Sequence, residues 1–219
     1  MFNPFRKSKG DISIIKSVSD HIETYFGEAA WVMHEKESPG IHVDVYVVEA
    51  TAERNYKRLI TSGMSEKPMP VPEGASDGRY AELTLCLPPE WPLSMEAFKD
   101  EANYWPVRLL KGVARFPYKN KTWLYAGHSM NWSDPPQPFA ANTAMTSVAL
   151  SWPKLGPPEA QTISLGSKKN ARLWAVYPLH EVEANFKVNS GSDALEKLLD
   201  GAGVTELLNP GRPSVVKHN

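Results

Sequence analysis

A histidine and an aspartate stand two residues apart in an otherwise apolar segment. His42 and Asp44 fall in a valine-rich run that favours a β-strand, so both side chains should project from the same face. There they could act as a general base with its partner, or as two ligands of a metal ion. Because an unpaired buried carboxylate is costly, we expect Asp44 to be structural, hydrogen bonded to loop backbone or to an arginine.

Two further residues are candidate nucleophiles. Ser65 follows Gly63 and Met64 as in the nucleophile elbow of serine hydrolases, but position 67 is lysine where the elbow requires a small residue. We therefore predict a loop serine bonded to its own backbone. Cys86 has no histidine nearby in sequence, and one free cysteine is usually a small buried apolar residue. The alternative that stays open is a hydrolase or a metal-dependent enzyme that uses His42, Asp44, Ser65, Cys86 or His128.

The chain carries no complete metal-binding motif. His180 and Glu181 begin like the helical zinc motif, in which two histidines four residues apart share one face, but the second histidine is absent. Glu183 and Lys187 are instead spaced as an exposed ion pair on a helix. A single cysteine excludes both an intramolecular disulfide and a zinc site built from cysteines. We therefore predict no metal and no cofactor.

Charge and composition exclude several classes of function. The 219 residues include 24 Lys plus Arg and 25 Asp plus Glu, for a net charge of −1. Non-specific binding to nucleic acid or to an anionic membrane requires a strong positive field, so neither is expected. No apolar run is long enough to span a membrane, and no secretory signal follows the first ten residues. These features predict a cytoplasmic protein.

Apolar spacing predicts a helix followed by many short strands. Over residues 11–26 the apolar side chains recur every three or four positions, which is typical of one helical face. Strands are predicted at 31–33, 41–48, 56–62, 80–87, 122–125, 145–152, 162–165 and 173–177, the first two as a hairpin. Further helices are predicted after Pro178 and over 193–199, the latter opened by a capping box of Asp193 and Glu196. Without regular alternation of strand and helix, the class is α+β with a mixed, mainly antiparallel sheet.

The middle of the chain is predicted from its prolines. A polar helix over 94–104 should give way to a second helix with Pro106 in its first turn. Trp105 lies at that joint, and we expect its ring to be buried where the helix meets the sheet. Residues 63–78 are too rich in proline and glycine to be regular, so they form a long loop.

Several segments together resemble the suppressor of fused family. Their order and spacing extend over about residues 12 to 200. The segments that carry the resemblance are 42–46, 59–65 with Pro68 and Met69, 80–83 leading to 87–92, 105–111, Gly127 with His128, and 178–183 followed by Gly191 and the helix at Ala194 and Leu195.

The resemblance implies a binding protein. Family members are not known as enzymes, and the two-domain animal protein captures a short peptide as an added β-strand between its domains. This chain has room only for the first of those domains. Stand-alone bacterial members are associated with polymorphic toxin systems, which implies an immunity protein that neutralises a toxin domain. An adaptor that binds a peptide with no toxin involved is the alternative, and a monomer or weak homodimer is expected.

The resemblance also implies a division of the chain and a set of structural residues. We expect a flexible segment over 1–10, the suppressor of fused-like domain over 11–208 and a tail over 209–219. The structural motif comprises Asp44, Thr61, Gly63, Glu82, Trp91, Trp105, Pro106 and Glu183. If the loop over 61–69 lies beside Asp44 and Glu82, both carboxylates could hold it by accepting its backbone N–H groups.

The long loop is the predicted docking surface for the partner. Binding residues concentrate on loops held by a rigid scaffold, and the prolines of this loop limit the entropy that it would lose on binding. Its two methionines are adaptable apolar contacts, and its serine, glutamate and lysine are polar contacts. The predicted partner-binding residues are Met64, Ser65, Glu66, Lys67 and Met69. A loop that only protects a sheet edge is the alternative.

Overall fold

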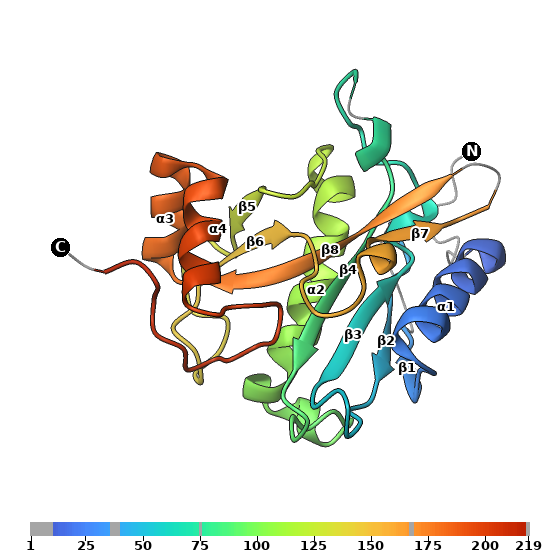
Figure 1. Cartoon of the computed structure of the whole chain (residues 1–219), viewed down its shortest axis with the longest axis horizontal. Helices are drawn as coiled ribbons and strands as arrows, with labels where there is room; N and C mark the ends of the chain where they lie inside the picture. Colours follow the sequence, from blue (N-terminus) through green and yellow to red (C-terminus); the bar gives the residue numbers. More distant parts are fainter. Residues whose placement is uncertain (1–10, 36–39, 75, 167–168, 218–219) are drawn as a thin grey trace.

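The structure, a computed structural model, describes residues 11–35, 40–74, 76–166 and 169–217. Its centre is an eight-stranded sheet in the order β1-β2-β3-β4-β8-β6-β5, with β7 pairing β8 (Figure 1). The strands are β1 (Trp31–Met33), β2 (Asp44–Val48), β3 (Lys57–Ser62), β4 (Ala81–Leu87), β5 (Ser129–Asn131), β6 (Ser147–Ser151), β7 (Thr162–Ser164) and β8 (Asn170–Leu179). The segment predicted as flexible, 1–10, lies outside the described residues.

The sheet is mixed, which confirms the predicted α+β class. Neighbours from β1 to β4 are antiparallel, as are the pairs of β8 with β6 and β7, and β4 with β8 forms the one parallel pair of the described sheet. Loops join the antiparallel strands from β1 to β4, whereas a parallel pair needs a long crossover. That crossover contains α2, β5, β6 and β7.

Helices cover both faces of the sheet. The helix α1 (Ile12–Phe26) begins at Asp11, whose carboxylate accepts the Ser13 N–H at 2.9 Å. It packs on the face that carries Tyr46 and Ile60, whereas α2 (Glu101–Asn120) packs on the opposite face. The pair α3 (Glu181–Ser190) and α4 (Ser192–Gly201) covers the C-terminal end of β8 (Figure 1). Short 3₁₀ turns complete the described elements: η1 (Met64–Glu66), η2 (Ser76–Gly78), η3 (Ala97–Lys99) and η4 (Pro158–Gln161).

The central helix differs from its prediction. Asp100 caps α2, and the helix continues through Pro106, which therefore does not lie in a first turn. A proline inside a helix leaves the carbonyl four residues earlier without its usual donor. Here the Asn142 side-chain amide donates to the Ala102 carbonyl at 2.9 Å, so the freed acceptor is satisfied from outside the helix.

Two other sequence predictions are corrected by the structure. Residues 122–125 form no strand, and the short strand β5 follows them instead. The helix α4 begins at Ser192 after Gly191, without the capping box predicted from Asp193 and Glu196. A capping interaction occurs one helix earlier, where the His180 N–H donates to Glu183 Oε2 at 2.9 Å.

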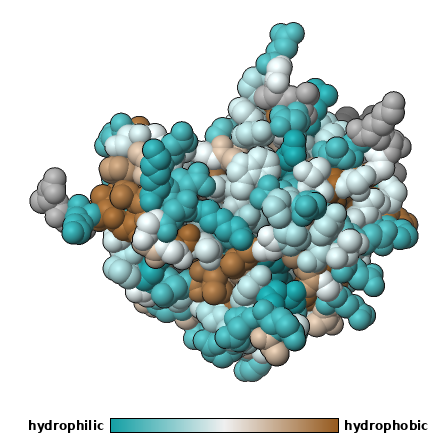
Figure 2. All heavy atoms as spheres, viewed as in Figure 1, coloured by the Kyte–Doolittle hydropathy of each residue, from teal (hydrophilic) through white to brown (hydrophobic). Residues whose placement is uncertain are grey.

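The C-terminal segment completes the edge of β4. The Cys86 N–H donates to the Glu206 carbonyl at 2.9 Å, and the Leu208 N–H donates to the Cys86 carbonyl at 2.8 Å. Beyond it, Arg212 is buried against α3. In Figure 2 the surface is mostly hydrophilic, and apolar patches interrupt it where α3 and the C-terminal segment lie. None of the described helices is both long and apolar enough to cross a membrane.

Candidate functional site

Glu82 anchors the loop that follows β3. Its carboxylate is fully buried and accepts the hydroxyls of Thr61 and Ser65, both at 2.6 Å. It also accepts the backbone N–H groups of Gly63 and Ser65, both at 2.9 Å. Burial raises the pKa of Glu82 to about 7 despite these donors. The prediction that this carboxylate holds the loop is confirmed.

The same loop is fixed from its other side. Gly63 has φ +121°, and a Cβ there would lie 1.9 Å from the His42 carbonyl oxygen, so only glycine fits. The Tyr118 hydroxyl donates to the carbonyl of Lys67 at 2.7 Å and also contacts the carbonyl of Met64. The start of the loop is therefore rigid.

Burial corrects the expected chemistry of this loop. Met64, Ser65 and Met69 are at most 1% exposed, so they fill the core and cannot offer the surface contacts predicted for them. Only Glu66, which is half-buried, and Lys67, which is exposed, remain at the surface. The Glu66 carboxylate accepts the Asp11 N–H at 3.0 Å and so joins the loop to the start of α1.

Asp44 is buried but holds a different segment from the one predicted. Its carboxylate lies 2.8 Å from the ring nitrogens of both His34 and His42, and it accepts the Glu35 N–H at 3.1 Å. It therefore bridges the two ends of the β1–β2 connection, and the prediction that it holds residues 61–69 is wrong. The expected contact between His42 and Asp44 is present.

The candidate nucleophiles are sealed from solvent. Ser65 is fully buried, and its hydroxyl donates to Glu82 instead of to a histidine. Cys86 is also fully buried, and burial raises the pKa of its thiol to about 12, so it stays protonated at neutral pH. Among the described residues, no group of three or more His, Cys, Asp or Glu side chains could hold a metal ion.

The aromatic and proline residues of the structural motif lie at the centre of the packing. Trp105 is fully buried, as predicted, and its ring stacks on Phe139 with 5.1 Å between centroids. Trp91 packs edge-on against it and donates its indole N–H to the Asn103 carbonyl at 3.0 Å. These residues, with Pro106, shape the core and are not available to a ligand.

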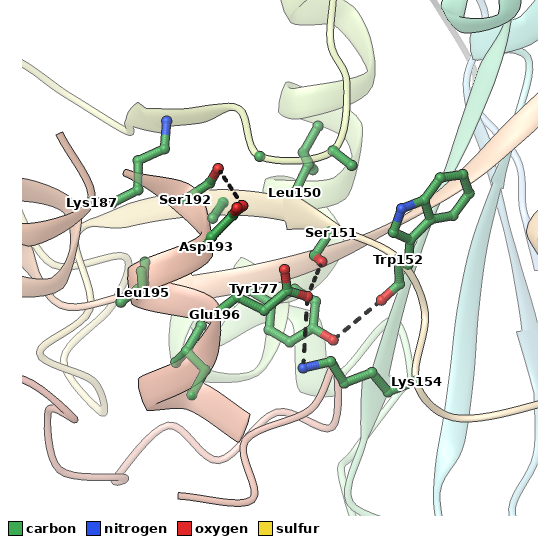
Figure 3. A pocket seen from close by; sticks show the side chains of 14 residues that line it. Leu150, Ser151, Trp152, Lys154, Tyr177, Lys187, Ser192, Asp193, Leu195 and Glu196 are labelled. Carbon is green, nitrogen blue, oxygen red and sulfur yellow. Dashed lines mark hydrogen bonds and ion pairs between the residues drawn. The ribbon is translucent and has the colours of Figure 1, made fainter. Parts of the chain in front are cut away.

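A pocket of about 200 Å³, the α4 pocket, opens between α4 and β6 (Figure 3). Across it the Ser151 hydroxyl donates to Glu196 at 2.9 Å, and the Lys154 amine lies 3.9 Å from Glu196. The Lys154 amine also pairs with Asp200 and lies 5.8 Å from the centroid of the Tyr177 ring. The pocket is lined by Ala126, Gly127, Ala149, Leu150, Ser151, Trp152, Lys154, Tyr177, Lys187, Ser192, Asp193, Leu195, Glu196 and Leu199.

A buried ion pair fixes the wall of this pocket. Arg58 and Glu206 are both fully buried, with 3.6 Å between guanidinium and carboxylate. Glu206 also accepts the backbone N–H groups of Lys154 and Leu155, at 3.0 and 2.9 Å. Residues 154–155 are thereby held beside α4.

A second cavity of about 260 Å³, the β5 hollow, lies beside β5. Gly127, with φ +83°, lines the α4 pocket, and a Cβ there would lie 3.2 Å from the Ser192 hydroxyl. Trp123 and His128 pack edge to face in the wall of the β5 hollow, with 4.7 Å between their ring centroids. Its lining comprises Phe116, Thr122, Trp123, Leu124, His128, Ser129, Met130 and Lys187.

Lys187 lines both cavities, and its expected partner is taken. Glu183 is fully buried, and both its oxygens lie 2.6 Å from the Arg212 guanidinium, so it is not the exposed partner of Lys187. Within the described chain Lys187 makes no ion pair. Sequence patterns do not predict these cavities, because their walls come from segments far apart in the chain.

Comparison with known proteins agrees with this architecture. The profile of the Suppressor of fused protein (SUFU) family matches residues 39–213. The chain belongs to the suppressor of fused family. Domains of this family are known as protein-interaction folds. No curated protein sequence matches the chain.

Solved structures of the family share the fold. A suppressor of fused homologue from Neisseria gonorrhoeae superimposes with a TM-score of 0.68 at 15% identity, over 95% of this chain and all of that one. The crystal structure of the Sufu–Fu complex gives 0.63 at 12% identity, over 92% of each chain. Suppressor of Fused from Drosophila superimposes with a TM-score of 0.60 at 12% identity, over 92% of this chain and 50% of that one.

Proposed function

We propose that the chain is a non-enzymatic binding module that captures an extended segment of a protein partner along β5. One observation carries the proposal: β5 lies at one end of the described sheet, and two of its residues, Ser129 and Met130, line the β5 hollow. In strand addition, main-chain hydrogen bonds supply affinity and pockets for side chains supply specificity. This arrangement offers both.

The hydrogen bonds of β5 support that mode. The His128 carbonyl accepts the Leu150 N–H at 2.9 Å, and the Trp132 N–H donates to the Thr146 carbonyl at 3.0 Å. In an antiparallel pair every second residue bonds to the neighbouring strand. The backbone groups of Ser129 and Asn131 therefore face away from β6, toward an incoming strand.

The partner we favour is a toxin domain, so the chain would be an immunity protein of the cytoplasm that acts as a monomer or weak homodimer. An adaptor that binds a peptide with no toxin involved uses the same surface. A toxin gene beside the gene for this chain would favour the immunity protein, and the absence of such a gene would favour the adaptor. In either case a folded, cofactor-free domain is enough for the task.

The test uses the outward N–H of Asn131. Asn131→Pro removes this donor, and Asn131→Ala keeps it, so the pair separates backbone pairing from side-chain contact. We expect calorimetry with the neighbouring toxin domain to give at least tenfold weaker binding for the proline variant, about 1.4 kcal/mol, and little change for the alanine variant. Equal affinities in two variants that fold, as judged by circular dichroism, would assign binding to another surface.

A hydrolase that uses His42, Asp44 or Ser65 is the remaining alternative. The buried positions of Ser65 and Cys86 weigh against it, because a nucleophile must reach its substrate. A broad hydrolase screen should be blank for the purified protein. Reproducible activity that Ser65→Ala or His42→Ala abolishes would reverse this choice.

The loop after β3 remains a candidate second contact through Glu66 and Lys67, the two of its predicted binding residues that reach the surface. Glu66 and Lys67 carry opposite charges on a rigid support, which suits a polar contact at the edge of an interface. A tenfold loss of partner affinity in Glu66→Lys, about 1.4 kcal/mol, would support that role.

A further inference from the structure

Lys187 is a cation whose expected partner is already in use. A glutamate four residues before a lysine usually pairs with it on a helix surface. In α3 that glutamate, Glu183, is turned into the core, where Arg212 binds both its oxygens. The amine of Lys187 is thereby left without an ion pair among the described residues, although the side chain is only half-exposed.

The amine is also kept apart from the acidic end of the α4 pocket. In Figure 3 it points away from Glu196 and Lys154, which pair with each other at the opposite end. Asp193, the other acid of that pocket, lies next to Ser192, whose hydroxyl donates to it at 3.4 Å. Lys187 therefore faces the β5 hollow as a free positive charge.

In the β5 hollow Lys187 carries the one formal charge of the lining residues. The other ionisable lining residue is His128, and burial, with a smaller contribution from the charge of Lys187, holds its pKa below the usual value. His128 is therefore neutral at pH 7. The remaining lining residues are apolar, aromatic or hydroxyl-bearing. A volume of about 260 Å³ is below the usual range for drug-sized ligands, roughly 300 to 1,000 Å³, and suits one side chain.

We infer that the β5 hollow is a binding site for an acidic side chain of the partner, an aspartate or glutamate whose carboxylate pairs with Lys187. This inference rests on the proposed capture of an extended segment at β5, and it adds the chemistry of one position in that segment. Ser129 and Met130 line the hollow, so a strand paired with β5 would place an alternate side chain within reach of the amine. Opposite charges at such a site set specificity as well as affinity.

The test is selection from a random-peptide phage library on the wild-type protein, followed by anisotropy titration of the enriched peptides. Lys187→Glu reverses the charge and Lys187→Met removes it. Lys197→Glu, on the exposed surface of α4, is the matched control. Circular dichroism shows that each variant is folded.

We expect the enriched peptides to share an aspartate or glutamate at one position. Lys187→Glu should bind them at least tenfold more weakly, Lys187→Met should weaken them less, and Lys197→Glu should bind within twofold of wild type. Replacing the shared acid by lysine should restore binding to Lys187→Glu. Enriched peptides without a shared acid, or with full affinity for Lys187→Glu, would overturn the acid site and leave peptide binding standing. No enrichment at all would overturn the acid site and capture of an extended segment together.

Discussion

Glu82→Gln should change the pH dependence of stability more than stability itself. Glutamine keeps the shape of the side chain and can still accept the N–H groups of Gly63 and Ser65. The glutamine nitrogen that replaces Oε2 cannot accept a hydrogen bond from the Thr61 hydroxyl. The oxygen of that hydroxyl already accepts the Leu83 N–H at 2.8 Å. At low pH, where Glu82 is also neutral, we expect the variant to be less stable by about 1 kcal/mol, the net value of one hydrogen bond.

The difference should then reverse as the pH rises. Burial raises the pKa of Glu82 from 4.5 to about 7 in the folded chain, so the folded state binds this proton more tightly than the unfolded state. The resulting stabilisation is complete below pH 4.5 and is lost as the pH rises through 7. From pH 5 to pH 8 the wild type should lose about 2.5 kcal/mol that glutamine cannot lose. Glu82→Gln should therefore be the more stable protein at pH 8, by about 2 kcal/mol.

Urea unfolding followed by tryptophan fluorescence at pH 5, 6, 7 and 8 measures this crossover. Glu73→Gln, in the exposed part of the same loop, is the matched control and should track the wild type at every pH. Contributions from other carboxyl groups cancel in the comparison, because all three proteins share them. A gap between wild type and Glu82→Gln that stays constant with pH would refute the reasoning, since it would mean that the four donors keep Glu82 ionised throughout.

Three further changes test the packing. Trp105→Ala should lower the free energy of unfolding by about 3 to 5 kcal/mol in urea melts, because it leaves a cavity against Phe139; a loss below 1 kcal/mol would contradict the burial of the ring. Arg212→Met should lower the free energy of unfolding by about 3 to 5 kcal/mol, because it leaves Glu183 charged and buried. The double variant with Glu183→Gln should recover part of that loss. A double variant no more stable than Arg212→Met would show that the two residues are not coupled. Asp44→Asn should lower the melting temperature by several degrees, since an amide can accept only through its one oxygen; an unchanged calorimetric midpoint would show that these bonds contribute nothing.

Most of the fold follows from patterns that act within one element. Helix α1 follows from apolar spacing alone, and β4 from strict alternation of apolar residues. The prediction fails where distant residues decide. Pro106 continues a helix because the Asn142 amide satisfies the carbonyl that the proline frees, and Asn142 lies 40 residues away from that carbonyl. Local propensity cannot report such a donor.

The candidate site was missed for the same physical reason. Spacing correctly places Glu183 and Lys187 on adjacent turns of one helix, and the pairing rule then makes each the partner of the other. What decides between that pair and the observed one is Arg212, in a segment that the sequence suggests is a tail. A guanidinium that binds both oxygens of a buried carboxylate contributes more free energy than an ammonium that pairs with a carboxylate at the surface. Glu183 therefore turns inward toward Arg212, and Lys187 is left facing the β5 hollow. The charge that would select a partner at β5 is thus a consequence of how the C-terminal segment packs, and changes at Arg212 should alter binding at Lys187 as well as stability.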